Sequence, residues 1–231
     1  MKALFDTPAN PLVPIRGEER GFPVQRIFCV GRNYAAHAAE MGAEVDREAP
    51  FYFTKPASAV VLAGATVPYP PGTSNLHYEM ELVIAIDKPA FRVSPEEALG
   101  AVYGYACGLD MTRRDLQNAA KEKGRPWDLG KAFENSAVLG PITPAQDFGP
   151  LADQRISLSV GGQIRQDATL SEMVWSVAEI ISHLSGYYHL QPGDLIFTGT
   201  PAGVGAVQAG DQMRGEIEGL DPVSLTLGPA E

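Results

Sequence analysis

The sequence predicts a mostly β, mixed α+β fold, a roll or sandwich of β-sheets with a few inserted helices. Short runs rich in β-branched and aromatic residues outnumber the helical segments and do not alternate strictly with them. The 24 glycines and 19 prolines are spread along the chain, and polar turns such as YPPGT and QPGD separate the runs. Without strict alternation, a doubly wound βαβ arrangement is disfavoured.

The chain of 231 residues is long enough for one large core. Residues 1–24 are interrupted by prolines and charges, and we interpret them as an N-terminal arm that leads into a first strand at 25–30. No internal repeat or low-complexity segment divides the remainder. We therefore expect a single domain of catalytic size over residues 25–231.

The remaining elements follow from local patterns. Further strands are predicted, in chain order, at 59–64, 80–86, about 101–109, 156–162, 194–199 and 223–228. Helical periodicity predicts four helices, each with a start or stop signal. Their ranges are 33–41, ended by Gly42; 94–100, opened by Ser-Pro-Glu-Glu; 111–123, ended by Gly124; and 170–185, ended by Gly186.

The composition narrows the classes of partner. The net charge of −10 disfavours nucleic acid and anionic membrane surfaces, because these partners require clustered Lys and Arg. An anionic small substrate would need a local positive site. No apolar run approaches the roughly 20 residues that span a bilayer, and the N-terminus lacks the apolar segment of a signal peptide. We expect a cytoplasmic protein with Cys29 and Cys107 as buried free thiols.

The stretch 75–86, NLHYEMELVIAI, has the composition of a strand but carries Glu79 and Glu81 two residues apart. Side chains alternate between the two faces of a strand, so both carboxylates point to the same side. That face continues with Val83 and Ala85, which predicts a strand covered on both faces. Two like charges at the edge of such a core repel each other and resist desolvation, so we expect something to compensate them.

Asp110 directly follows the predicted strand at 101–109 and precedes a predicted helix. One interpretation makes Asp110 the N-cap of that helix, and an isolated Glu-x-Glu is more often a solvated face than a metal site. Taken with Glu79 and Glu81, Asp110 indicates a site for a hard divalent cation, which prefers oxygen ligands. Mg²⁺ or Mn²⁺ suits three carboxylates that leave positions for water and substrate, whereas a structural Ca²⁺ site would prefer more protein oxygens.

Three nearby side chains are candidates for substrate contacts. Asp110, Arg114 and Gln117 have the spacing of one helix face, so Arg114 would lie beside a metal bound by Asp110 and could hold an anionic substrate. Lys131 lies in an apolar and aromatic segment and is a candidate to stabilise a developing oxyanion. The alternatives are a surface ion pair for Arg114 and a snorkelling surface lysine for Lys131.

A further pair, His37 and Glu40, lies three residues apart on the short helix predicted in GRNYAAHAAEM, 31–41. A carboxylate beside an imidazole fixes its tautomer and raises its basicity, as a general base acting on water requires. A chance pair on a solvated helix is the alternative. The segment FTGTPAGVG, 197–205, lacks the Lys-Ser/Thr of a phosphate-binding loop. We interpret it as a tight turn around Thr200 that could bind a carboxylate, or as an ordinary β-turn.

Six segments, in order, resemble the signature blocks of the fumarylacetoacetate hydrolase superfamily. They run from about residue 25 to about residue 215 and read VGRNYAAHAAEM, KPASA, NLHYEMEL, GLDMTRRDLQ, RPWDLGKAF and LQPGDLIFTGTPAGVG. Within this family, the chain is most similar to the short bacterial acylpyruvase type, and especially to the fumarylpyruvate hydrolases of gentisate degradation. The segment FPVQRIFCVGRNYAAHAAEMG carries much of this finer similarity.

The resemblance implies a fold, an assembly and a metal. The fold is the mixed β-roll of the family's C-terminal domain, usually present as a homodimer. Glu79, Glu81 and Asp110 are implied to hold Mg²⁺ or Mn²⁺. His37 and Glu40 are implied to activate water, on a segment that orders over the substrate.

The resemblance also implies a reaction, the hydrolysis of the C–C bond of an acylpyruvate, a small anionic 2,4-dioxo acid. Fumarylpyruvate would give fumarate and pyruvate. Water activated by the His–Glu pair would attack the C4 carbonyl, and Lys131 and Gln117 would stabilise the oxyanion. Arg114 would line the site, with Lys55 and Thr200 near the substrate anion.

Two other functions fit part of the same pattern. The site could decarboxylate oxaloacetate, or isomerise and decarboxylate related 2-oxo acids, because only the first bond broken differs. A non-catalytic, metal-stabilised binding module is the alternative of a different class. Such a module predicts neither a lysine in the site nor a His–Glu pair beside it.

Overall fold

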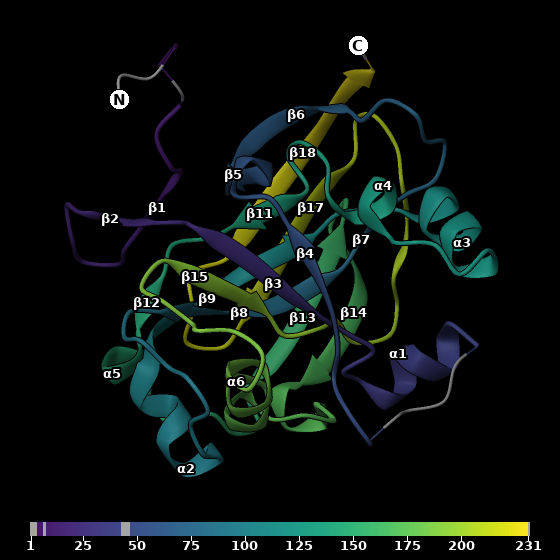
Figure 1. Cartoon of the computed structure of the whole chain (residues 1–231). Helices are drawn as coiled ribbons and strands as arrows, with labels where there is room; N and C mark the ends of the chain where they lie inside the picture. The colour runs from purple at the N-terminus through teal and green to yellow at the C-terminus, as the bar shows by residue number, and fades with distance from the viewer. Residues whose placement is uncertain (1–3, 7, 43–46, 231) are drawn as a thin grey trace.

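The computed structural model describes residues 4–6, 8–42 and 47–230, and its body is built of two β-sheets packed face to face (Figure 1). The larger sheet has the order β4 (Phe51–Lys55), β3 (Arg26–Gly31), β15 (Asp194–Phe197), β8 (Met80–Ile86), β9 (Val102–Asp110), β11 (Ala137–Leu139) and β5 (Val60–Leu62), and β12 (Thr143–Pro144) also pairs with β9. The second has the order β14 (Gln163–Thr169), β13 (Arg155–Val160), β17 (Gln212–Ile217), β18 (Val223–Ala230) and β6 (Ala65–Tyr69).

Smaller elements complete the fold. A three-stranded sheet has the order β10 (Thr112–Arg113), β7 (Leu76–Tyr78) and β16 (Gly205–Val207). The α-helices of the described residues are α1 (Ala35–Glu40), α2 (Pro95–Ala98), α3 (Arg114–Glu122), α4 (Asp128–Lys131), α5 (Ala145–Phe148) and α6 (Val177–Ser185). Single 3₁₀ turns occur at Ala57–Ala59, Leu99–Ala101 and Leu170–Glu172. The predicted mostly β, α+β fold is confirmed, and each predicted strand has a counterpart.

The main core lies between the two sheets. Alternate side chains of β8, among them Met80, Leu82 and Ile84, are buried there with residues of β13 and β17 such as Ile156 and Met213. Because side chains alternate along a strand, Val83 and Ala85 lie on the other face of β8, in a second apolar cluster. The prediction of a strand covered on both faces is confirmed.

The second cluster is completed by the N-terminal segment. β1 (Leu12–Pro14) and β2 (Gly21–Pro23) form an antiparallel hairpin (Figure 1). Its Val13 and Phe22 are buried with Cys29 and Phe197 of the large sheet. The division into an arm at 1–24 and one domain at 25–231 stays a prediction. Cys29 and Cys107 are buried free thiols, as expected, and burial raises the pKa of both.

The helix expected from residue 111 begins later. Asp110 is the last residue of β9, and the chain then pairs as β10 with β7, so that α3 starts only at Arg114. Asp110 is therefore not the N-cap of α3; that position belongs to Arg113. Long-range strand pairing has overridden local helical propensity here.

The helix expected over 170–185 is also divided. Residues 170–172 form a 3₁₀ turn, and α6 starts at Val177 after a capping box of Ser176 and Glu179. Between them the backbone of Val174 donates to the carbonyl of Asn33, which holds the segment in a non-helical conformation. None of the helices in the described part of the chain is long and apolar enough to cross a bilayer.

Candidate active site

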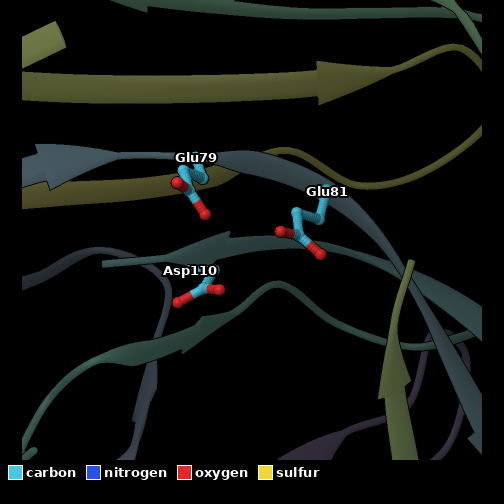
Figure 2. A group of neighbouring side chains, drawn as sticks. All are labelled: Glu79, Glu81 and Asp110. Carbon is cyan, nitrogen blue, oxygen red and sulfur yellow. The ribbon is translucent and has the colours of Figure 1, made fainter. Parts of the chain in front are cut away.

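Three carboxylates converge at one end of the paired strands β8 and β9. Glu81 on β8 lies opposite Gly108 on β9, and the N–H of Asp110 donates to the carbonyl of Glu79 at 2.9 Å. One oxygen from each of Glu79, Glu81 and Asp110 lies within 4.8 Å of the others (Figure 2). All three are buried, with at most 5% of their surface exposed. The strand register thus produces the cluster that the spacing predicted.

Cationic side chains compensate two of these carboxylates. Lys131 Nζ lies 2.6 Å from Glu79 Oε2 and 2.7 Å from Asp110 Oδ2. Arg114 Nη2 lies 2.6 Å from Glu79 Oε1, and Lys55 Nζ lies 2.8 Å from Asp110 Oδ1. Burial alone would raise the pKa of Glu79, but the charges of Lys131 and Arg114 outweigh burial and hold that pKa well below its usual range.

Glu81 has a different environment. Its Oε2 accepts a hydrogen bond of 2.7 Å from the N–H of Gly199, and no cationic side chain of the described residues forms an ion pair with it. Burial, followed by the negative charges of Asp110 and Glu79, raises the pKa of Glu81 well above its usual range. A buried carboxylate without a counter-charge is costly, so a cation at this point would stabilise the site.

The residues present fit a hard divalent cation. Three carboxylates supply oxygen donors only, as Mg²⁺ and Mn²⁺ prefer. Asp110 Oδ1 is buried and has no hydrogen-bond partner among the described residues, although Lys55 lies close enough for an ion pair. Glu81, which has no ion pair with a cationic side chain of the described residues, leaves acceptor capacity at the cluster.

Lys131 and Gln117 differ in how many of their donors are already used. Lys131 Nζ also donates to Thr112 Oγ1 at 2.7 Å, so all three of its N–H groups have partners. Gln117 Oε1 accepts from Arg114 Nη1 at 2.6 Å, which leaves the amide N–H groups of Gln117 as donors. Arg114 Nε is buried and has no hydrogen-bond partner among the described residues.

The predicted His37–Glu40 pair is formed on α1. His37 Nδ1 lies 3.2 Å from Glu40 Oε2; the imidazole is buried, and the carboxylate is about one-third exposed. A proton on Nδ1 satisfies this contact and leaves Nε2 as the basic nitrogen. Glu40 is held in turn by the N–H of Gly203 at 3.2 Å.

The turn at 197–205 thus binds two of the protein's own carboxylates, through Gly199 to Glu81 and through Gly203 to Glu40. Both glycines have a φ of +96°, which favours glycine. A Cβ at Gly203 would also overlap the carbonyl oxygen of Arg165. In the structure the turn binds these two carboxylates of the protein itself, and a contact of Thr200 with a substrate carboxylate stays a prediction.

Most of the predicted site residues line one narrow cavity, which we call the site cavity. They are His37, Glu79, Glu81, Arg114, Gln117, Lys131 and Thr200. Lys55 lies behind Asp110, where its fully buried ammonium also donates to the carbonyls of Met111 and Lys131. The predicted contact of Lys55 with a substrate anion stays a prediction.

Two supporting amides carried no signal in the sequence pattern. Gln166 Nε2 donates to Thr200 Oγ1 at 2.8 Å and to the carbonyl of Pro201 at 2.7 Å, and its Oε1 accepts from the N–H of Met80. Asn33 is fully buried and bonds the carbonyls of Thr198 and Trp175 through its Nδ2. Only the tertiary fold makes either residue important, because all of their partners are distant in sequence.

Replacing Asn33 by alanine is expected to lower the free energy of unfolding by about 2–4 kcal/mol, because buried backbone groups lose their partners. Two carbonyls and the N–H of Trp175 are affected. Urea denaturation of the variant measures the loss. Asn118→Ala, at an exposed position of α3, is the matched control and should change stability by less than about 0.5 kcal/mol. Equal stabilities for the two variants would contradict a structural role for the Asn33 amide.

Comparison with known proteins places this geometry in a family. A family model described as fumarylacetoacetate (FAA) hydrolase C-terminal matches residues 26–227. The chain belongs to the fumarylacetoacetate hydrolase family. The resemblance found in the sequence is therefore confirmed. A fumarylpyruvate hydrolase of Ralstonia sp is 58% identical over 194 residues, which are 83% of this chain and 100% of that relative.

Other members of the fumarylacetoacetate hydrolase family extend the comparison. The crystal structure of fumarylpyruvate hydrolase from Pseudomonas aeruginosa, in complex with Mn²⁺ and pyruvate, has a TM-score of 0.95 and 51% identity. The match covers 99% of this chain and 100% of that one. An oxaloacetate tautomerase of Escherichia coli (strain K12) is 37% identical over 86% of this chain and 90% of that protein.

Proposed function

We propose that this family member is a metal-dependent hydrolase that cleaves the C–C bond of an acylpyruvate, and that fumarylpyruvate is its preferred substrate. The products would be fumarate and pyruvate. The observation that carries the proposal is the convergence of His37, Gln117 and two buried carboxylates, Glu79 and Glu81, at one cavity. Asp110 completes the carboxylate cluster, and Glu40 contacts the imidazole of His37. The names of the Ralstonia and Pseudomonas relatives support the choice of substrate.

Glu79, Glu81 and Asp110 would hold the divalent cation, Mg²⁺ or Mn²⁺. When bound, such a cation supplies Lewis acidity that polarises a keto oxygen of the substrate. The Mn²⁺ in the Pseudomonas enzyme's structure supports this choice of metals. Lys131 and Lys55 would position the carboxylates, since their ammonium groups already contact Glu79 and Asp110.

His37 would take a proton from water through Nε2, with Glu40 holding the imidazole in the required tautomer. The hydroxide would add to the C4 carbonyl of the acylpyruvate, and the amide of Gln117 would donate to the oxyanion. The C3–C4 bond then breaks, its electron pair passes to C3, and a proton delivered to C3 completes the methyl group of pyruvate. Lys131 could also stabilise the oxyanion only if its ammonium released one of its three hydrogen bonds. This role of Lys131 stays a prediction.

The substrate carboxylate next to the keto group would be held by two groups of the site cavity. Arg114 Nε is buried without a hydrogen-bond partner in the described chain and is available as a donor. Thr200 Oγ1 accepts from Gln166, so its own O–H can donate to the substrate.

A second candidate function is the isomerisation or decarboxylation of oxaloacetate or a related 2-oxo acid. It is favoured by relatives named oxaloacetate tautomerase, from Escherichia coli at 37% identity and from Homo sapiens at 41%. Oxaloacetate carries the same 2-oxo acid group as an acylpyruvate, so the same carboxylates, Arg114 and Thr200 would bind it.

A panel of substrates separates the candidates. We expect the Mg²⁺- or Mn²⁺-loaded protein to hydrolyse fumarylpyruvate with a higher kcat/KM than maleylpyruvate or acetylpyruvate, and to have little activity on oxaloacetate. EDTA should abolish the activity. Turnover of oxaloacetate without hydrolysis of any acylpyruvate would overturn the first proposal in favour of the second.

We also propose that the protein acts in the cytoplasm as a homodimer, on small anionic substrates and without a nucleic-acid or membrane partner. The net charge of −10 supports the absence of polyanionic partners. Light scattering of the purified chain tests the dimer.

A further inference from the structure

The site cavity adjoins a larger cavity of about 400 Å³, which we call the outer cavity. The two share Gly31, Arg32, Lys121 and Trp127 as lining residues, so they meet along a common wall. The other side chains of interest in the outer cavity are Phe51, Arg125 and Trp175. A substrate bound in the site cavity could therefore extend one end into the outer cavity.

The described residues that line the outer cavity carry a net positive charge, in a protein of net charge −10. Three cationic residues, Arg32, Lys121 and Arg125, line it, and no carboxylate of the described residues does. None of the three has a side-chain hydrogen bond or ion pair in the part of the chain that the structure describes. Elsewhere arginines commonly pair with carboxylates: Arg16 with Asp221, Arg26 with Asp194, Arg155 with Asp167 and Arg214 with Glu216.

Neighbouring positive charges act on Lys121. Burial, followed by the positive charges of Arg32 and Arg114, lowers the pKa of Lys121. Arg32 has a φ of 59°, a left-handed conformation that is uncommon for a long side chain and that clusters at ligand sites. Unpaired like charges around one cavity are stabilised by a bound anion.

We propose that the outer cavity is the acyl subsite of the enzyme, where Arg32, Lys121 and Arg125 bind a carboxylate at the far end of the acyl group. The proposal rests on the proposed function and narrows its substrates to acylpyruvates whose acyl group is itself a carboxylic acid. Guanidinium groups match a carboxylate with paired, charge-assisted hydrogen bonds.

The walls of the cavity suit a flat, unsaturated chain between the two ends of the substrate. Trp127 packs edge-on against Phe51, with ring centroids 4.9 Å apart, and both side chains line the outer cavity. A further cavity, also lined by Arg125 and Trp127, includes Asp128, which offsets its positive charge and makes it the weaker candidate for an anion.

Kinetics on two substrates test the subsite. Lys121→Gln and Arg125→Gln should each lower kcat/KM for fumarylpyruvate about tenfold, because a charge-assisted hydrogen bond is lost. Acetylpyruvate has no distal carboxylate, and its kcat/KM should change less than about twofold in either variant. Arg125→Lys should retain most of the activity on fumarylpyruvate.

Lys123→Gln is the matched control, since it removes an exposed charge beside the same helix and outside both cavities. It should leave both substrates within about twofold of the wild type. Equal losses on the two substrates, or no loss on fumarylpyruvate, would overturn the subsite while leaving acylpyruvate hydrolysis intact.

Intrinsic fluorescence reports on the subsite without turnover. The chain has two tryptophans, Trp127 and Trp175, and both line the outer cavity. Fumarate should change the emission of the Mg²⁺-loaded protein at lower concentrations than crotonate, which has a methyl group in place of one carboxylate. Arg125→Gln should remove this difference.

The two experiments separate the two proposals. If no acylpyruvate is hydrolysed but fumarate still binds in preference to crotonate, and does so through Arg125, the subsite stands and the proposed function fails. If acylpyruvates are hydrolysed and the protein does not discriminate between fumarate and crotonate, the subsite fails.

Discussion

Replacing His37 by alanine is expected to lower kcat for fumarylpyruvate hydrolysis by about 10²–10⁴-fold, the usual contribution of a general base. The imidazole is buried at the site cavity, and the carboxylate of Glu40, 3.2 Å from its Nδ1, leaves Nε2 to accept a proton from water. No ion pair joins His37 to the three carboxylates, so the affinity for Mn²⁺ should stay within about threefold of the wild type, a change of less than 1 kcal/mol. Steady-state kinetics and a Mn²⁺ titration measure the two quantities.

His189→Ala is the matched control for this variant. His189 is exposed and stacks on Phe91, with ring centroids 3.7 Å apart, and it lines neither of the two cavities. Its activity should be that of the wild type. Unchanged turnover in His37→Ala would remove His37 from the mechanism. A fall in Mn²⁺ affinity as large as the fall in kcat would instead indicate damage to the carboxylate cluster.

Local alternation raised the question of what compensates Glu79 and Glu81, and the companion segments at 31–41, 108–117 and 131 favoured a metal over a solvated face. Glu81 lies on β8 and Glu79 directly precedes that strand, in the break between β7 and β8. The apolar residues that follow at the same spacing, Val83 and Ala85, indicated that this face becomes buried. Asp110 ends the neighbouring strand, and antiparallel pairing brings the end of β9 to the start of β8. The alternation along β8 and the end of β9 were readable from the sequence, whereas the break of the strand at Glu79 was not.

The partners of the cluster depend on contacts that have no period. Glu79 is compensated by Arg114, 35 residues away, and by Lys131, 52 residues away. Lys131 was expected in the site, but nothing in its neighbourhood indicated that all three of its donors would be used by Glu79, Asp110 and Thr112. The catalytic roles of the site residues stay predictions.

The predicted starts of two helices were wrong for the same reason, contacts with residues distant in the sequence. The segment after Asp110 pairs with β7, and the segment before α6 is held by the backbone and side chain of Asn33. In both places a strand or an amide distant in the sequence satisfies backbone groups that a helix would otherwise satisfy internally. Propensity and capping signals describe only the local alternative, so they placed both helix starts too early.

Replacing Glu81 by glutamine is expected to have opposite effects on the metal-free and metal-loaded protein. In the metal-free protein, burial and the neighbouring carboxylates raise the pKa of Glu81, so that folding at neutral pH requires this carboxyl to take up a proton at a cost in free energy. Glutamine does not have this cost, so stability should increase. In the presence of metal it removes a ligand, and the affinity for Mn²⁺ should fall about 100-fold or more. Thermal unfolding with EDTA and with Mn²⁺ measures both effects.

The wild type provides the reference for these measurements. Mn²⁺ at 100 times its Kd stabilises the folded state by about 2.7 kcal/mol, which should raise the Tm of a chain of this size by roughly 5–10 °C. Glu81→Gln should start from a higher Tm in EDTA and gain little from Mn²⁺. Glu122→Gln, at an exposed position of α3, should behave as the wild type does in both conditions. A lower Tm of Glu81→Gln in EDTA would show that the carboxylate is stabilised without metal, through Gly199 alone, and the need for a cation at this point would then disappear.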